Sequence, residues 1–236
     1  MSRHPDHTPA RRLRRIHHRL LDTYGSQSWW PAQTPFEMIV GAYLTQNTSW
    51  KAVELSLSSL RAAGALTMAG LHALPLDELQ RLIRPSGFIT RKAPALKAFV
   101  TMLIAEFGGS LDKLGAVPSG PLRIRLLALP GVGPETADAI MLYALGHPVP
   151  VADEYLRRIA ERHRLIQPAP GKNRRGYESL VQLTASAFAS EPDPEKAQHF
   201  NEFHALTVAV GKAHCGRTPR CQGCPLAYDL ECAATG

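Results

Sequence analysis

Short apolar stretches with helical spacing, separated by glycine and proline, are the feature that most restricts the fold of this chain. In residues 11–24, for example, Leu13, Ile16 and Leu20 recur at intervals of three and four residues, so they share one face of a helix. No stretch shows a sustained alternation of apolar and polar residues, which is the pattern of a half-buried strand. The sequence therefore predicts an all-α fold with short connections.

The predicted helices fall into an N-terminal helix and two later groups. After the helix at 11–24, a loop rich in Ser, Trp and Pro is expected over residues 25–35. Six helices are then predicted at residues 35–44, 49–62, 75–83, 92–107, 120–128 and 135–145, and three more at 153–163, 177–189 and 195–210. With 236 residues, of which 44% are hydrophobic, the chain can build a core as one large domain or two small interlocked ones.

The charge balance is basic, because 27 Lys and Arg against 20 Asp and Glu give a net charge of +7. A basic surface favours a polyanionic partner such as nucleic acid, although it also serves solubility alone. The basic segment 11–19 lacks the apolar core of a signal peptide, and no window approaches the roughly 18 apolar residues of a membrane span. We expect a cytoplasmic, nucleoid-associated monomer without membrane contact.

The sharpest motif is Leu-Pro-Gly-Val-Gly-Pro-Glu-Thr-Ala at residues 129–137, between two predicted helices. Gly131 and Gly133 flank Val132, so the backbone can turn tightly, a ligand can approach closely and the valine can anchor the turn. The helix that follows presents unpaired N–H groups, which suit a DNA phosphate. A tight turn between two helices without any DNA contact produces the same pattern.

A second motif, Val-Pro-Val-Ala-Asp at residues 149–153, begins about 16 residues beyond the hairpin glycines. In this order and spacing the two motifs resemble the helix-hairpin-helix DNA glycosylases of the endonuclease III superfamily, and the match extends from about Pro35 to Cys232. The resemblance implies a six-helix barrel over residues 36–146 and a helical iron-sulfur domain formed by residues 1–35 and 147–236. It also implies excision of damaged bases from double-stranded DNA.

By this resemblance Asp153 is the catalytic carboxylate, which stabilises the cationic sugar as the N-glycosidic bond breaks or activates the attacking nucleophile. An aspartate before an apolar helix is also a common N-cap, and both functions can coexist. Bifunctional members carry a lysine two residues after the second hairpin glycine, where this chain has Glu135. Because a carboxylate cannot form an imine, we expect a monofunctional enzyme with absent or weak lyase activity.

Two further residues correspond by resemblance to side chains that enter the DNA. Gln46 matches a glutamine that enters through the minor groove and fills the gap left by the extruded base. Phe88 is a second candidate wedge by its position. A helix cap is the alternative for Gln46, and core packing is the alternative for Phe88.

The aromatic residues near these positions most resemble the 3-methyladenine DNA glycosylase III branch. In that branch one Trp of the pair matching Trp29 and Trp30, together with the aromatic residue at the position of Trp50, sandwiches the flipped base. Electron-rich rings attract the positive charge of an alkylated purine, which is therefore the implied substrate. Ordinary core packing is the alternative for each ring. For the whole chain the alternatives are an endonuclease III-like enzyme for oxidised pyrimidines and a non-catalytic damage-binding module.

All four cysteines lie within the last 22 residues, at Cys215, Cys221, Cys224 and Cys232. Such clustering does not suit a disulfide framework for a chain of this length and indicates a reduced metal site. Spacing alone does not separate zinc from a [4Fe-4S] cluster. The family carries the cluster, with six, two and five residues between ligands, whereas this chain has five, two and seven. The cluster is the expected cofactor and zinc is the alternative.

The loop between the first two cysteines is short and basic. We expect its Arg217 and Arg220 to contact the DNA backbone, together with the hairpin residues Gly131, Val132 and Gly133. A solvated basic loop is the alternative for the two arginines.

Overall fold

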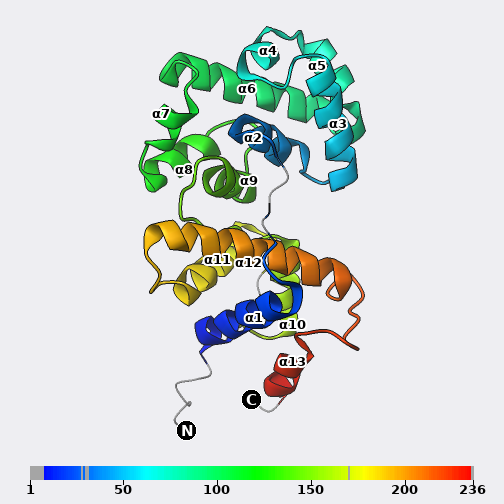
Figure 1. Cartoon of the computed structure of the whole chain (residues 1–236), viewed down its shortest axis with the longest axis vertical. Coiled ribbons are helices and arrows are strands. Elements are labelled where there is room, and N and C mark those ends of the chain that lie inside the picture. The colour runs from blue at the N-terminus through cyan, green and yellow to red at the C-terminus, as the bar shows by residue number, and fades with distance from the viewer. Residues whose placement is uncertain (1–7, 28, 30–31, 170, 235–236) are drawn as a thin grey trace. The chain divides into compact units, whose positions relative to one another are not determined.

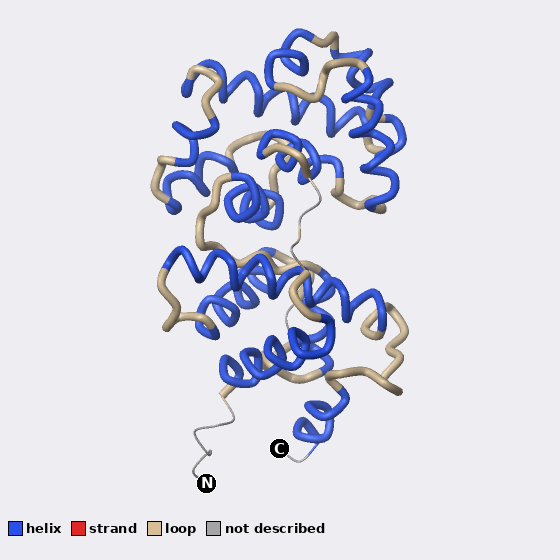
Figure 2. Tube along the Cα trace, in the orientation of Figure 1, coloured by secondary structure: helices blue, strands red, loops and turns tan. Residues whose placement is uncertain are grey.

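The computed structural model describes residues 8–27, 29, 32–169 and 171–234, without the side chains of residues 194 and 231–234. It is built from helices (Figures 1 and 2). Within the described ranges there is no strand, only an isolated bridge between Cys215 and Pro219. The all-α prediction is therefore confirmed. A membrane span would need a longer and more apolar helix than any that the described residues form.

The order of elements follows the predicted helices closely. The first half contains α1 (Pro9–Tyr24), α2 (Pro35–Leu44), α3 (Trp50–Ala62), α4 (Met68–Ala73), α5 (Leu76–Leu82), the 3₁₀ turn η2 (Arg84–Ser86), α6 (Ile89–Phe107) and α7 (Leu111–Gly115). The second half contains α8 (Ser119–Leu127), α9 (Pro134–Ala139), the π-helical segment η3 (Ile140–Ala144), α10 (Glu154–Arg162), α11 (Arg174–Ala187), α12 (Asp193–Ala213) and α13 (Ala227–Ala234).

Three helices are absent from the sequence prediction: α4, α7 and α13. They contain six, five and eight residues, respectively. Segments of about two turns or less repeat their apolar positions too few times for a helical period to be recognised.

Hydroxyl side chains define where the early helices begin. Thr8, Thr34 and Ser49 each accept a hydrogen bond from the backbone N–H three residues ahead, at the starts of α1, α2 and α3. Such N-caps satisfy a donor that has no partner within the helix. In α1 and α2 the next residue is proline, whose fixed φ suits the first helical position.

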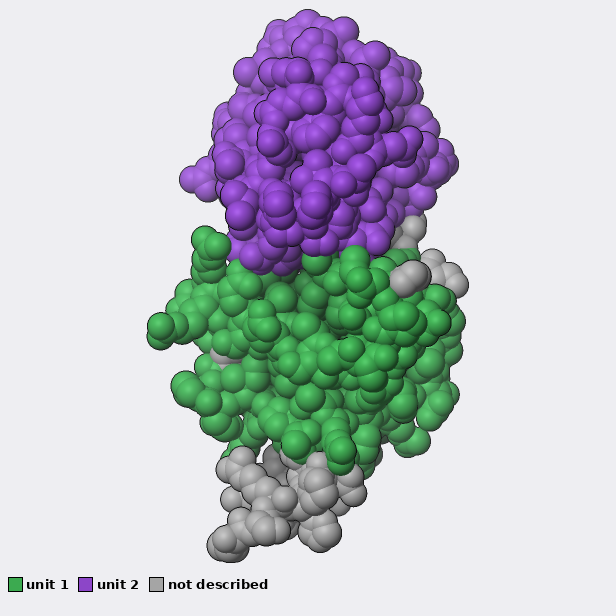
Figure 3. Space-filling view, turned by 90° about the vertical axis from the view of Figure 1, so that its left-hand side faces the viewer, with its two compact units in different colours: residues 1–29, 148–236 green, residues 30–147 purple. Residues whose placement is uncertain are grey.

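The chain divides into two compact units, coloured separately in Figure 3. Unit 1 comprises residues 1–29 and 148–236, and unit 2 comprises residues 30–147. Unit 1 thus combines both ends of the chain, while unit 2 is a single continuous segment.

The core of unit 2 is organised around α2, which contacts α3, α6, α9 and η3. Eight of the ten residues of α2 are buried, as expected for a helix that is enclosed by others. Its buried charge, Glu37, pairs with Arg61 of α3 at 2.6 Å. Helices α2, α3, α5, α6, α8 and α9 correspond to the six predicted for the barrel, and α4 and α7 are additional.

In unit 1, α1 packs against α11 and α12, and α10 packs against the same two helices. Gly211 permits the close approach of α12 to α10, because a Cβ atom there would lie 2.1 Å from Cδ1 of Tyr155. A buried ion-pair network joins α1 and the end of α10 to α13: Asp229 accepts from Arg12 at 2.7 Å and from His163 at 2.9 Å. Burial alone would raise the pKa of Asp229, but these two partners outweigh it and lower the pKa.

His17 of α1 is buried in the aromatic core of unit 1. Its ring packs edge-on against Phe188, with centroids 5.1 Å apart, and lies near Phe203 and His199. Neither ring nitrogen has a hydrogen-bond partner among the described residues. Burial, with smaller contributions from His18, His199 and Arg14, lowers the pKa of His17 from 6.5 to about 4.

This burial predicts a loss of stability in mild acid. Because the folded-state pKa lies below the unfolded value, the contribution of His17 is complete above pH 6.5 and disappears as the pH falls towards 4. The free energy of unfolding should fall by up to about 3 kcal/mol over this window. In urea denaturation at several pH values, His17→Leu should remove this part of the decline. The exposed His72→Gln should retain it. Parallel curves for wild type and His17→Leu would contradict the prediction.

Candidate active site

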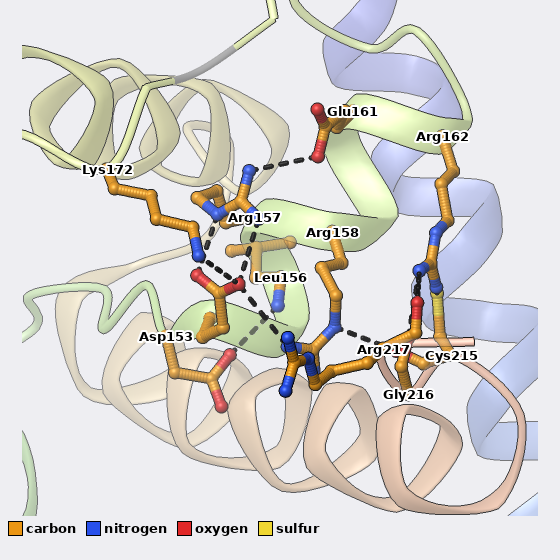
Figure 4. Close-up of polar contacts among 11 residues, drawn as sticks. Asp153, Leu156, Arg157, Arg158, Glu161, Arg162, Lys172, Cys215, Gly216 and Arg217 are labelled. Atoms are coloured by element: carbon orange, nitrogen blue, oxygen red, sulfur yellow. Dashed lines mark hydrogen bonds and ion pairs between the residues drawn. The ribbon is translucent and has the colours of Figure 1, made fainter. Parts of the chain in front are cut away.

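Asp153 is the N-cap of α10. Its backbone is extended, and Oδ1 accepts a hydrogen bond from the Leu156 N–H at 2.9 Å. The N-cap function considered from the sequence is therefore present. Figure 4 shows one carboxylate oxygen directed to this N–H and the other pointing away from it. The second oxygen, Oδ2, lies 3.6 Å from Nε2 of His204, and 12% of the Asp153 side chain is exposed.

His204 connects Asp153 to one of the predicted base-contacting tryptophans. It lies on α12 and is buried, and its ring meets the Trp29 ring edge-on, with centroids 5.3 Å apart. Trp29 itself is half-buried. In unit 1, His204 thus contacts both Asp153 and Trp29. The sequence offers no signal for His204, which stands as a lone histidine in a long helix, and Trp30 lies outside the described residues.

The carboxylate next in sequence, Glu154, is occupied by cations. It accepts hydrogen bonds from Arg157 at 2.7 and 2.8 Å, and it also pairs with Arg158 and Lys172. These charges, mainly the hydrogen bonds from Arg157, lower the pKa of Glu154 to about 2. Glu154 is therefore held as a charged partner of Arg157, Arg158 and Lys172.

The predicted hairpin is the connection between α8 and α9 in unit 2. Gly131 adopts a left-handed φ of 74°, and a Cβ there would lie 3.0 Å from Cβ of Ala95, so glycine is required. Gly133 is extended, with open space beside it, and Val132 is half-buried. Glu135 is exposed in the first turn of α9.

A buried ion pair holds the two hairpin helices together. Arg123 of α8 donates two hydrogen bonds to Asp138 of α9, at 2.6 and 2.9 Å, and Asp138 is buried. Paired N–H donors from one guanidinium fix the orientation of a carboxylate as well as its distance. This contact fixes the angle at which α9 leaves the turn.

Gln46 docks on the hairpin across a large sequence separation. Its Nε2 donates to Gly131 O and to Thr136 Oγ1, both at 3.0 Å. The caps of the neighbouring helices are Thr45 and Ser49, so the helix-cap alternative for Gln46 is wrong. Gln46 and the hairpin therefore form one polar cluster in unit 2.

The remaining aromatic candidates of unit 2 are at the starts of helices. Trp50 is the first residue of α3, half-buried, and its Nε1 donates to Glu54 at 2.8 Å. Phe88 precedes α6 with a left-handed φ of 50°, and 55% of its surface is exposed. Because a core residue would be buried, the core-packing alternative for Phe88 is wrong.

The cysteine-containing segment follows α12. Cys215 is buried, Cys224 is half-buried and Cys221 is exposed, and none of the three forms a disulfide with another described residue. Burial, with smaller contributions from Cys215 and Cys221, raises the pKa of Cys224. Cys232 lies on α13, and its side chain is outside the described residues. Among the side chains that are described, no three His, Cys, Asp or Glu form a group ready to hold a metal ion.

Two arginines of α10 fix the beginning of this segment (Figure 4). Arg162 donates to Cys215 Sγ at 2.9 Å and to the carbonyls of Gly216 and Arg217 at 2.8 and 2.9 Å. Arg158 donates to Cys215 O at 2.9 Å. Cysteine sulfur is the ligand type that both zinc and iron-sulfur groups take, so the described sulfur donors fit such a group chemically. Arg217 and Arg220 are exposed, and Arg220 also donates to Lys212 O at 3.2 Å.

Comparison with known proteins agrees with this arrangement. Residues 40–182 match the model of the HhH-GPD superfamily of base excision DNA repair proteins. A Methanocaldococcus jannaschii protein named "Putative DNA repair glycosylase MJ1434" is 37% identical over 90% of this chain and 92% of its own. The thymine/uracil-DNA glycosylase of Pyrobaculum aerophilum is 30% identical over 86% of this chain and 82% of its own.

A solved structure is similar over nearly its whole length. The H. pylori 3-methyladenine DNA glycosylase, crystallised with 1,N6-ethenoadenine, has a TM-score of 0.72 and 26% identity, covering 87% of this chain and 98% of that one. The family match spans the hairpin and Asp153, and the relatives extend it over most of the sequence. The chain therefore belongs to the HhH-GPD superfamily of base excision DNA repair proteins.

Proposed function

We propose that this chain extrudes a damaged base from duplex DNA and hydrolyses its N-glycosidic bond with the help of Asp153. The chain is a DNA N-glycosylase of the HhH-GPD superfamily, and the proposal concerns its chemistry and substrate. The observation that carries it is that the two carboxylate oxygens of Asp153 have different contacts. One oxygen caps α10, whereas the other points away from the cap beside His204.

This geometry supports a charge-stabilising or proton-accepting function for Oδ2. The cap fixes the side chain, so the second oxygen is held in one direction without further ordering. A fixed carboxylate can stabilise the cationic sugar and accept a proton from the attacking water. Glu154 is less suited to this chemistry because its negative charge is already paired with Arg157, Arg158 and Lys172.

Hydrolysis without lyase chemistry is supported by Glu135. This residue occupies the position, two beyond Gly133, at which bifunctional enzymes would carry a lysine. A carboxylate there offers no amine to attack the sugar, so water is the proposed nucleophile.

An alkylated purine is the proposed substrate. Trp29 and Trp50 are both half-buried rather than fully enclosed in a core, and an indole ring can stack on a base. The likeness to the H. pylori 3-methyladenine DNA glycosylase supports the same substrate class. The second candidate is thymine or uracil, which the identity to the P. aerophilum thymine/uracil-DNA glycosylase favours.

We propose that the DNA is held by the hairpin, by the basic loop between the first two cysteines and by two wedge residues. The hairpin residues Gly131 to Gly133 and the exposed Arg217 and Arg220 contact the phosphate backbone. Gln46 and the exposed Phe88 enter the stack and fill the gap that the extruded base leaves.

We also propose that the four cysteines hold a [4Fe-4S] cluster. Cys215, Cys221, Cys224 and Cys232 supply four thiolates, and Arg162 donates to the first of them. When bound, the cluster would order the segment that carries Arg217 and Arg220 rather than take part in bond cleavage.

Replacing Asp153 tests the proposed chemistry without removing the cap. Asparagine caps helices about as well as aspartate, so Asp153→Asn should change the free energy of unfolding by less than about 0.5 kcal/mol. Single-turnover release of the preferred base should nevertheless fall at least about 100-fold, because the carboxylate charge is lost. The adjacent Glu154→Gln should stay within about threefold of wild type. Unchanged base release by Asp153→Asn would refute the assignment.

The substrate is identified in the same assay. Separate duplexes carry 3-methyladenine, 1,N6-ethenoadenine, an oxidised pyrimidine, or thymine or uracil opposite guanine. The proposal expects fastest release of an alkylated purine. Fastest release of thymine or uracil would replace it with the second candidate. Fastest release of the oxidised pyrimidine, or no release from any duplex, would contradict both candidates.

Metal analysis tests the proposed cluster. Protein purified without oxygen should contain roughly four iron atoms per chain and absorb broadly in the visible range. Cys221→Ser should lose this absorption because one thiolate ligand is removed. A colourless protein with one zinc ion per chain would contradict the assignment.

A further inference from the structure

A buried lysine joins the two turns that carry the proposed wedge residues of unit 2. Lys92, in the first turn of α6, is only 3% exposed. Its Nζ donates to Leu44 O and to Ser86 O, each at 2.7 Å. Leu44 ends α2 two residues before Gln46, and Ser86 ends η2 two residues before Phe88. One amine therefore fixes a carbonyl at the start of both turns.

Both turns have strained backbone conformations. Asn47, directly after Gln46, has a φ of 53°, and Phe88 itself has a φ of 50°. Residues other than glycine adopt this left-handed region at a cost, and they remain there only when their surroundings hold them. The Lys92 ammonium also lies 5.7 Å from the centroid of the Phe88 ring, within the range of a cation–π contact.

The energetics indicate a positioning function for this amine rather than a contribution to stability. Burial lowers the pKa of Lys92, which reflects the cost of removing an ammonium from water. Hydrogen bonds to the carbonyls of Leu44 and Ser86 offset this cost, but an apolar side chain of similar length would avoid it altogether. An apolar side chain would not, however, provide the hydrogen bonds by which Lys92 connects the turns at Leu44 and Ser86.

We infer that Lys92 is a positioning residue for base extrusion, which holds the Gln46 and Phe88 turns at the spacing needed to fill one gap in the DNA. The inference rests on the proposed wedge functions of these two residues. Gln46 is additionally held by the hairpin, through Gly131 O and Thr136. Phe88 is exposed, so its position depends more on the backbone of its own turn.

The same helix provides a matched control. Lys97, also on α6, donates to Leu71 O and His72 O, both at 2.8 Å. These carbonyls lie in the last turns of α4, which carries no proposed wedge residue. Lys97→Met therefore removes a lysine–carbonyl contact of the same kind at another place in unit 2.

The test compares Lys92→Met and Lys97→Met in the full chain on two substrates. One is a fully paired duplex that contains the lesion whose base the protein releases. A 2-aminopurine next to the lesion reports unstacking through its fluorescence. The other carries the lesion in an unpaired bulge, where extrusion has already occurred. On the paired duplex, Lys92→Met should reduce both unstacking and base release about tenfold. On the bulge the reduction should be less than about twofold, because extrusion costs a few kcal/mol only when the base is stacked. Lys97→Met should behave as wild type on both.

Several outcomes overturn the inference. Equal losses on both substrates would show a general structural effect, as would equal losses in Lys92→Met and Lys97→Met. Gln46→Ala and Phe88→Ala should reproduce the duplex-specific loss, and their failure to do so would remove the wedge functions on which the inference rests. Because 2-aminopurine fluorescence needs no bond cleavage, a failure of the proposed chemistry remains distinguishable. If Lys92→Met does not fold, Lys92→Gln is compared with Lys97→Gln in the same way.

Discussion

The hydrogen bond from the Leu156 N–H to Asp153 Oδ1 is the interaction on which the proposed chemistry depends. It makes Asp153 part of the α10 backbone structure, so the carboxylate is held at one place and in one orientation. The second oxygen then has a defined environment, next to the buried His204. His204 in turn contacts the Trp29 ring. Preorganisation of this kind, rather than flexibility, is what a charge-stabilising group requires.

In unit 2, too, hydrogen bonds between side chains and the backbone fix the proposed functional residues. Here polar side chains donate to backbone carbonyls of the turns. Gln46 binds Gly131 O, and Lys92 binds Leu44 O and Ser86 O. The Arg123–Asp138 pair adds a rigid link between the helices of the hairpin. Buried Lys92 thus fixes the backbone just before both proposed wedge residues, Gln46 and Phe88, while Gln46 is also bound to the hairpin.

Much of this arrangement is local and could be predicted from the sequence. The longer helices show enough apolar repeats to be recognised, and an aspartate before an apolar helix signals its N-cap. The turn at Gly131 was predictable because glycine favours the left-handed conformation that this residue adopts, whereas Gly133 is extended and its backbone does not require glycine. The helices α4, α7 and α13 were missed because they are too short to show a period.

The contacts that complete the sites are long-range, and the sequence contains no local signal for them. His204 stands 51 positions from Asp153, and Lys92 stands 48 positions from Leu44. Histidine in a helix or lysine near its start is ordinary in sequence terms. Only the tertiary structure shows that these two side chains are buried beside proposed functional residues.

The most direct test of the account is the fate of the DNA strand after base release. The protein is incubated with the duplex whose base it removes, with and without sodium borohydride, and the products are separated on a denaturing gel. Hydrolysis assisted by Asp153, with Glu135 in place of a lysine, predicts an intact strand with an abasic site and no covalent adduct. A borohydride-trapped adduct that accumulates as fast as the base is released would contradict it.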